Sequence, residues 1–173
     1  MNNTIKQIAL IAIAFTFTFV SCVTPIEEVE QRTEAQELEE ISQLISKVES
    51  EGLDVDTTAL GIYYVVDSVG TGPTPMVGDT CFMEYTGSFI DGSIFDDSSY
   101  HPENVDGVWE FVFKENSLIP GFEDGITLMS KGTKLNLIVP SSLGYGPSGS
   151  YSIPPYATLI FKTKMVDLRP ASN

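Results

Sequence analysis

The side chains that most often carry out catalysis or hold a metal ion are scarce in this chain of 173 residues. It contains one histidine, His101, and two cysteines, Cys22 and Cys81. A zinc site needs several His or Cys ligands, and a nucleophilic serine needs a histidine beside it, so the sequence predicts neither a metal centre nor a Ser-His-Asp triad. We interpret His101 as a surface-loop residue without a chemical role. Cys81 lies in a strand-like run and is expected to be a buried, unreactive thiol.

Acidic residues are abundant, but their arrangement does not suggest a catalytic pair. Asp96-Asp97 and Glu123-Asp124 are neighbours in the sequence, and adjacent side chains point apart in a helix or a strand. The net charge is −15, from nine Lys and Arg against 24 Asp and Glu, which argues against a nucleic-acid partner. The sequence has no glycine-rich phosphate loop, so no cofactor is expected. What it offers instead is a set of aromatic residues.

An antiparallel sheet in residues 58–173 is predicted to position these aromatic residues. Short runs rich in β-branched and aromatic residues, separated by Gly and Pro, are typical of strands. In the last run, apolar positions alternate with Lys162 and Lys164, which indicates one buried and one solvent-facing side. Asp91-Gly92 favours a type I′ hairpin turn. The predicted strands are 62–66, 80–86, 88–90, 93–95, 108–113, 135–139 and 158–168.

One segment of this region has the periodicity of a helix. Phe122, Ile126 and Met129 share one face of a helix that begins near Pro120 and ends before Gly132. The simplest arrangement of one helix and several antiparallel strands places the helix across the sheet. The predicted fold class is therefore α+β.

The preceding segment, 22–57, has a different composition. It carries eleven acidic residues against only Arg32 and Lys47, and it lacks aromatic residues. Apolar residues recur at steps of three and four, which predicts an amphipathic helix within 26–50, ended by Gly52. Three roles are open for this helix: it docks on its own domain, it forms the seam of a homodimer, or it is an acidic spacer before a linker at 54–58. Its apolar residues are Leu38, Ile41, Leu44, Ile45 and Val48.

Residues 1–21 have the layout of an export signal. A polar start with Lys6 leads into an apolar run at 8–15 that is too short to span a bilayer. The small residue Ser21 directly before Cys22 resembles the bacterial lipobox, at which the signal is removed and the cysteine is acylated. This pattern predicts a bacterial cell-envelope protein, held by a lipid on Cys22 at the outer membrane or the periplasmic face. A plain secretory signal with an incidental cysteine is the alternative.

Several motifs between residues 60 and 169 occur in the order known from one protein family. They are Tyr85-Thr86-Gly87, Asp91-Gly92, Phe95-Asp96, 118–125, Gly144-Tyr145-Gly146 and 153–161. With these motifs the chain resembles the FKBP-type peptidyl-prolyl cis-trans isomerases. The resemblance implies a twisted antiparallel sheet wrapped around one short helix, with an apolar proline-binding pocket between them. The predicted organisation is a lipoprotein signal peptide at 1–21, an acidic helical tether or dimerisation arm at 22–57, and an isomerase domain at 58–173.

Isomerisation of a peptide bond suits a chain that is poor in His and Cys. Rotation about the bond has a barrier of about 18–20 kcal/mol, but no covalent bond breaks, so no nucleophile is needed. A dry pocket that grips the proline ring and binds the twisted amide better than the planar one lowers this barrier. The expected partners are therefore proline-containing polypeptides in exported proteins.

The resemblance also assigns site residues, position by position. It implies that Ile119 offers its backbone N–H and Tyr145 its hydroxyl to carbonyl groups of the substrate. Asp96 is implied to orient Tyr85 or to bias the electric field at the twisting amide, and Phe122 to form the floor under the proline ring. The other pocket residues that it implies are Phe95, Trp109, Leu118, Ile153 and Phe161.

Some positions depart from the family pattern. Phe122 stands where many relatives have Trp, and Trp109 stands where many have Phe, so the depth of the pocket is expected to differ. The loop at 97–108 is longer, and the loop at 146–153 shorter, than in compact relatives. Because both loops border the pocket, an alternative function stays open: a proline-peptide-binding or chaperone-like module that does not accelerate isomerisation.

Overall fold

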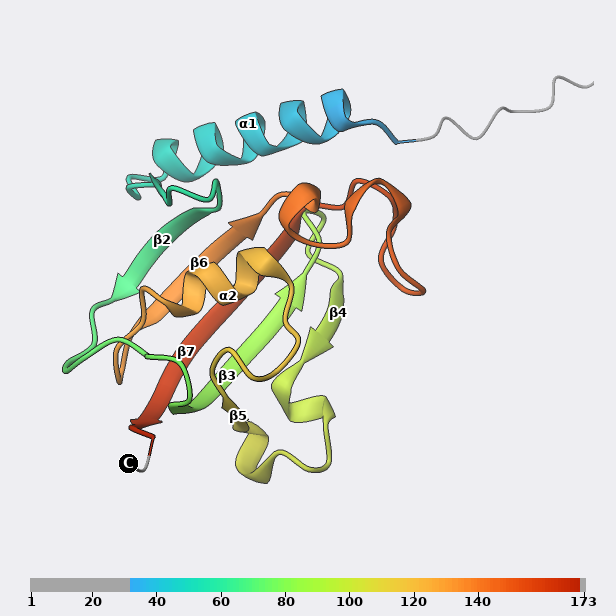
Figure 1. Cartoon of the computed structure of the whole chain (residues 1–173). Helices are drawn as coiled ribbons and strands as arrows, with labels where there is room; N and C mark the ends of the chain where they lie inside the picture. Colours follow the sequence, from blue (N-terminus) through green and yellow to red (C-terminus); the bar gives the residue numbers. More distant parts are fainter. Residues whose placement is uncertain (1–31, 172–173) are drawn as a thin grey trace, which may run out of the picture. The chain divides into compact units, whose positions relative to one another are not determined.

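Two helices and a seven-stranded antiparallel sheet make up residues 32–171, the part of the chain that the computed structural model describes (Figure 1). The predictions for the signal at 1–21 and for Cys22 concern residues outside this range. The helices and strands are α1 (Glu34–Ser50), β1 (Asp56–Thr57), β2 (Tyr63–Ser68), β3 (Thr80–Ser88), β4 (Ile94–Asp97), β5 (Trp109–Val112), α2 (Pro120–Ile126), β6 (Lys134–Val139) and β7 (Leu159–Arg169). Four short 3-10 helices are η1 (Ser98–Tyr100), η2 (Val105–Gly107), η3 (Ser141–Leu143) and η4 (Gly146–Ser148).

The sheet confirms the predicted α+β fold. Its strand order is β1-β2-β6-β7-β3-β4, and β5 pairs with β3 beside β4. In the long strand β7, Phe161, Thr163 and Met165 are buried on one side, whereas Lys162 and Lys164 lie on the other. This alternation is what the sequence pattern predicts for a sheet with one solvent-facing side.

Helix α2 lies across the buried side of the sheet, as Figure 1 shows. Two glycines one turn apart let its backbone come close to β6: a Cβ atom at Gly121 would lie 2.4 Å from Val139 Cγ1, and one at Gly125 would lie 2.4 Å from Leu137 Cδ1. The helix ends at Ile126, one turn earlier than its apolar periodicity predicts. The reason is that the next turn tightens, since the N–H of Met129 donates to Ile126 O.

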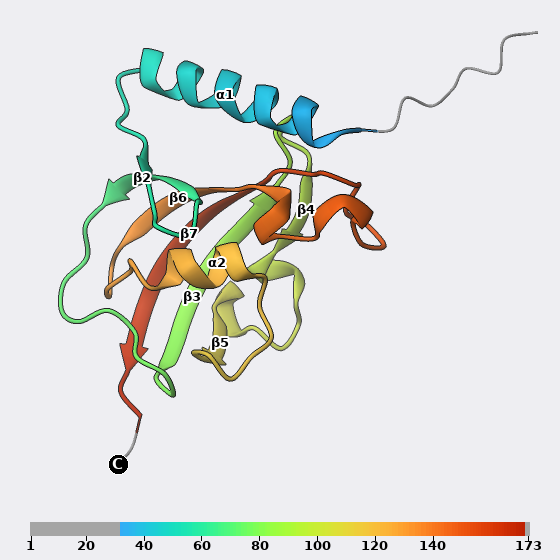
Figure 2. The same cartoon turned by 45° about the horizontal axis from the view of Figure 1, so that its top comes forward.

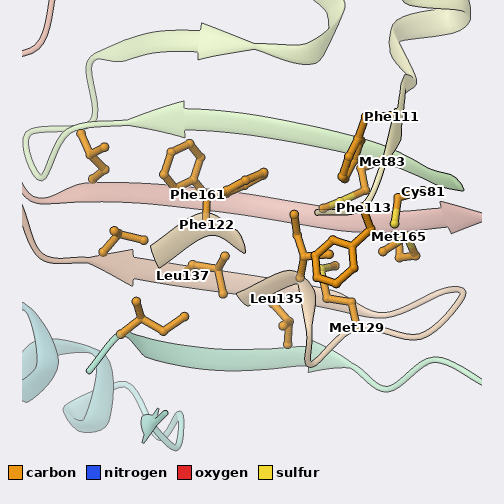
Figure 3. Close-up of a cluster of buried hydrophobic side chains, with 14 of the residues drawn as sticks. Cys81, Met83, Phe111, Phe113, Phe122, Met129, Leu135, Leu137, Phe161 and Met165 are labelled. Carbon is orange, nitrogen blue, oxygen red and sulfur yellow. The ribbon is translucent and has the colours of Figure 1, made fainter. Parts of the chain in front are cut away.

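The hydrophobic core fills the space between α2 and the sheet (Figure 3). Phe122 and Ile126 reach into it from α2, and Cys81 is fully buried on β3. Burial, with a smaller contribution from Asp79, raises the pKa of the Cys81 thiol to about 12, so the thiol is protonated at neutral pH. The main sheet and loop residues of this core are Met83, Phe111, Phe113, Met129, Leu135, Leu137, Val139, Leu159, Phe161 and Met165.

The β3–β4 hairpin forms where it was predicted, but its turn is not type I′. A type I′ turn needs a positive φ at both central residues, and only Gly92 has one, at 86°. The loop is instead closed by hydrogen bonds from Gly92 N–H to Phe89 O and from Phe89 N–H to Ser93 O. The Asp91 side chain accepts from the Ser93 N–H at 2.9 Å, which stabilises this longer loop.

Helix α1 docks on its own domain, which is one of the three roles left open by the sequence. It begins at a capping box in which the Thr33 hydroxyl accepts from Gln36 N–H and the Gln36 side chain accepts from Thr33 N–H. Ile41 is buried, whereas Leu38 is 57% exposed. Figures 1 and 2 show α1 apart from α2, beyond the end of the sheet.

The segment expected to be a linker, 54–58, contributes to the sheet. Asp56 and Thr57 form β1 and pair with Tyr64 and Tyr63 of β2. The sheet therefore begins close to the end of α1. Between residues 32 and 171, neither helix combines the length and the apolar character that a membrane crossing requires.

Candidate functional site

A cavity of about 440 Å³ opens beside the N-terminal end of α2. Five aromatic residues from four strands and from α2 line it. Two further residues come from the connection between β6 and β7. The lining residues are Tyr85, Phe95, Asp96, Trp109, Ser117, Leu118, Ile119, Pro120, Phe122, Gly144, Tyr145 and Phe161.

The aromatic rings fix one another at the base of this cavity. Phe122 is 5% exposed, and its ring centroid lies 4.7 Å from that of Phe161, with 52° between the ring planes. Tyr85 packs edge-on against Phe122 at 5.8 Å, and Phe95 packs edge-on against Phe161 at 5.7 Å. Such offset and edge-on contacts are favourable because the positive edge of one ring meets the negative face of another. Figure 3 shows Phe122 and Phe161 next to each other.

Trp109 extends the wall on strand β5. Its ring stacks on Phe111 with the centroids 4.1 Å apart and meets the edge of Tyr85 at 5.7 Å. The register of the sheet explains this placement, because Trp109 pairs with Met83 and Tyr85 is two residues further along β3.

One edge of the cavity is polar. The Tyr85 hydroxyl donates to Asp96 Oδ2 at 2.9 Å. Burial and this hydrogen bond raise the pKa of Tyr85 well above its usual value, so its hydroxyl stays protonated and acts as a donor. Asp96 Oδ1 accepts from the backbone N–H of Asp97 at 2.8 Å, which helps to hold the carboxylate in place.

Two further donors face the cavity from its other sides. Ile119 is the N-cap residue of α2, and its N–H has no acceptor within the described part of the chain. Tyr145 lies between η3 and η4, is 42% exposed, and its hydroxyl likewise has no hydrogen-bond partner among residues 32–171. A cavity with an apolar base and hydrogen-bond donors at its rim can bind a small apolar ring whose neighbouring carbonyl groups accept hydrogen bonds.

The cavity brings together all the residues that the sequence analysis assigned to a pocket except Ile153. Ile153 is not a lining residue; it is 5% exposed and belongs to the hydrophobic core. Ser150 and Ile153 exchange two backbone hydrogen bonds in this loop, at 2.8 and 3.1 Å. Ser117, Pro120 and Gly144 line the cavity although they were not predicted to do so.

His101 was interpreted as a loop residue without a chemical role, and this interpretation misses its contact with the site. Its Nε2 atom lies 2.8 Å from Asp96 Oδ1. The only signal in the sequence was that it follows Asp96 by five residues, which says nothing of the path of the loop between them. Among residues 32–171, no three His, Cys, Asp or Glu side chains are arranged to hold a metal ion.

The chain is similar in sequence to several known proteins. The family model described as FKBP-type peptidyl-prolyl cis-trans isomerase matches residues 72–166. FkpA of Escherichia coli strain K12 is 32% identical over 162 residues, which is 84% of this chain and 58% of FkpA. The chain thus spans less than two thirds of that relative. Outer membrane protein MIP of Legionella longbeachae is 34% identical over 65% of this chain and 46% of its own length.

Solved structures agree in fold. The crystal structure of FkpA from Escherichia coli matches with a TM-score of 0.64 and 31% identity, over 80% of this chain and 63% of that one. The crystal structure of a peptidyl-prolyl cis-trans isomerase from Pseudomonas syringae pv. tomato matches with a TM-score of 0.65 and 27% identity. That match covers 82% of this chain and 98% of the other.

Proposed function

The chain belongs to the family of FKBP-type peptidyl-prolyl cis-trans isomerases, and from this premise we propose that it accelerates the isomerisation of peptide bonds before proline. The observation that carries the proposal is the cavity of about 440 Å³, with an aromatic base and hydrogen-bond donors at its rim. Its substrates are proline-containing segments of polypeptides, which fit a site that is apolar below and polar at its edge.

The proposed mechanism depends on differential binding of the twisted amide. Phe122 and Phe161 hold the proline ring, while Tyr85 and Trp109 keep water away from the bond that turns. An amide in a dry environment loses the hydrogen bonds to water that favour its planar, charge-separated form, so its rotation becomes easier. The Ile119 N–H donates a hydrogen bond to a carbonyl group of the substrate, and this hydrogen bond is stronger when the amide is twisted than when it is planar.

An isomerisation assay with proline peptides tests this proposal. Because the chain must only hold and desolvate the amide, Phe122→Ala is expected to reduce kcat/KM by roughly tenfold or more through loss of the base of the cavity. Tyr145→Phe is expected to reduce it less, through loss of one hydrogen bond. Tyr63→Phe is the matched control, because Tyr63 lies on β2 and does not line the cavity.

The same assay separates catalysis from binding alone. The long loop at 97–108 and the Phe122 base distinguish this cavity, and they are the reason to consider a module that only binds. Saturable binding of proline peptides without any acceleration, across several residues before proline, would replace the proposed function with a proline-peptide-binding or chaperone-like one.

We further propose that the protein is lipid-anchored in a bacterial cell envelope through Cys22. The Ser21-Cys22 junction after an apolar run supports acylation, and a relative that is named an outer membrane protein supports the location. Each buried CH₂ of an acyl chain contributes about 0.8 kcal/mol to membrane binding. Mass spectrometry of the protein from envelope fractions should find acyl chains on Cys22, and Cys22→Ala should release the protein; an unmodified Cys22 would contradict the anchor.

A further inference from the structure

Glu37, in the first turn of α1, is a buried acidic residue outside the cavity. Within residues 32–171 it forms no ion pair with a lysine or an arginine. Its Oε1 atom accepts from the backbone N–H of Ser141 at 2.5 Å and from the Thr158 hydroxyl at 3.0 Å. Its Oε2 atom accepts from the Ser141 hydroxyl at 2.5 Å. Because Ser141 and Thr158 are buried as well, these three hydrogen bonds are shielded from water and hold one defined arrangement.

The two residues that bind Glu37 are the ends of the connection between β6 and β7. Ser141 is the first residue of η3, and Thr158 directly precedes β7. The N-cap residue of η3, Pro140, makes no side-chain hydrogen bond, so the acceptor for the first N–H of η3 comes from Glu37, 104 residues earlier in the sequence. Figure 1 shows this connection next to the N-terminal half of α1. One side chain of α1 therefore holds both ends of the loop 141–158.

This loop carries part of the cavity wall, Gly144 and Tyr145. The N–H of Gly144 donates to Ser141 O at 2.9 Å. On the returning side of the loop, the N–H of Tyr156 donates to Gly146 O at 3.1 Å. Backbone hydrogen bonds thus connect both ends of the loop to the neighbours of Tyr145. Since the Tyr145 hydroxyl has no hydrogen-bond partner within residues 32–171, its place at the rim depends on the backbone that carries it.

We propose that Glu37 is a positioning residue of the isomerase site: it holds the loop 141–158 at both ends and thereby sets the position of the Tyr145 hydroxyl at the rim of the cavity. The inference rests on the proposed function, because it adds a residue to the same site. It also makes α1 part of the isomerase unit, since a domain that began at residue 58 would lack this carboxylate.

A double-mutant cycle in the isomerisation assay with proline peptides tests the inference on the purified protein. Glu37→Ala is expected to lower kcat/KM about threefold, because it acts through the one hydrogen bond that the Tyr145 hydroxyl donates to the substrate. In the Tyr145→Phe background the same change should lower kcat/KM by less than about 1.5-fold, since no hydroxyl remains to be positioned. A threefold loss in both backgrounds would overturn the inference, because independent effects multiply.

Two further variants separate positioning from stability. Glu37→Gln keeps the length of the side chain and an acceptor for the Ser141 N–H, so its kcat/KM should stay within about twofold of the wild type. Ile41→Ala removes a buried side chain of the same helix, so it should lower stability but leave kcat/KM unchanged where all variants are folded. An equal loss of kcat/KM in Ile41→Ala and Glu37→Ala would mean that α1 acts through stability alone. If Glu37→Ala does not fold, Thr158→Val replaces it in the cycle, because it removes one hydrogen bond and nearly keeps the shape of the side chain.

The outcomes separate this inference from the proposed function. If the wild-type protein accelerates isomerisation but the cycle shows no coupling, the positioning role is wrong while the isomerase activity stands. If the wild-type protein has no activity, the proposed function fails, and the NMR signals of the Tyr145 ring then decide. Signals that shift in Glu37→Ala or Thr158→Val but not in Ile41→Ala support the positioning role. Signals that stay unchanged, or that shift equally in Ile41→Ala, overturn it.

Discussion

The carboxylate of Glu37, in α1, accepts hydrogen bonds from the backbone N–H and from the hydroxyl of Ser141, each at 2.5 Å. The Thr158 hydroxyl donates a third, at 3.0 Å. Glu37 is only 3% exposed, which is unusual for a carboxylate unless it is fully paired. Because Ser141 and Thr158 flank the segment that carries Tyr145, this carboxylate ties α1 to one side of the cavity.

Removing this carboxylate should destabilise the folded protein. Glu37→Ala leaves the buried donors of Ser141 and Thr158 without an acceptor, so the free energy of unfolding should fall by about 3 kcal/mol. Urea unfolding measures this change. Glu39→Ala, at an exposed position of the same helix, is the control and should change stability by no more than about 0.5 kcal/mol. Equal effects of the two variants would mean that α1 does not dock through Glu37.

The docked position of α1 also predicts the oligomeric state. Ile41 is 3% exposed against its own domain, whereas Leu38 is 57% exposed, so the apolar face is largely used within one chain. The protein should therefore sediment as a monomer, and Ile41→Glu should lower its stability by about 3 kcal/mol without changing its sedimentation. Leu38→Glu should alter neither property. A dimer that Leu38→Glu dissociates would restore the dimer-seam hypothesis for residues 26–50.

The strands and α2 could be predicted because local periodicity reflects burial. The alternation of Phe161 and Met165 with Lys162 and Lys164 is enough to define the two sides of β7. The turn at Gly92 and the end of α2 could not be predicted, because both depend on which backbone hydrogen bonds close a short loop. Such choices differ by small energies that composition does not reveal.

The cavity could be predicted only because its motifs follow one another in the order known from one family. The residues around the cavity were predicted less well. Glu37 belongs to an acidic helix and was counted as part of its charge, since burial of a carboxylate depends on donors more than a hundred residues away in the chain. His101 was missed because the path of the loop after Asp96 decides whether the two side chains meet. Ile153 was assigned to the pocket by resemblance, but it belongs to the core and is not among the residues that line the cavity.

Asp97 should make stability depend on pH. Partial burial acts to raise the pKa of Asp97, but the hydrogen bonds that Ser99 and Thr86 donate to its carboxylate have the larger combined effect. The pKa of Asp97 is therefore lowered. A carboxylate whose pKa is lowered in the folded state stabilises the protein at pH values above its pKa in the unfolded chain, which is about 3.9. This stabilisation is lost as the pH falls through the pKa of the folded state. Asp97→Asn should therefore lower the urea midpoint at pH 7 and have little effect near pH 2. Asp54→Asn, at an exposed position, is the control; an equal effect of Asp97→Asn at both pH values would contradict the prediction.

The only tryptophan of the chain lies in the cavity wall and should report substrate binding. A proline ring that enters the cavity displaces water beside Trp109, so its emission should move to shorter wavelength and saturate as peptide is added. The same peptide with alanine in place of proline should give a much weaker response. Phe122→Ala should weaken the apparent affinity, because it removes the base of the cavity while Trp109 remains. A response that is unchanged in Phe122→Ala would mean that the peptide binds elsewhere, and that the cavity is not the proline site.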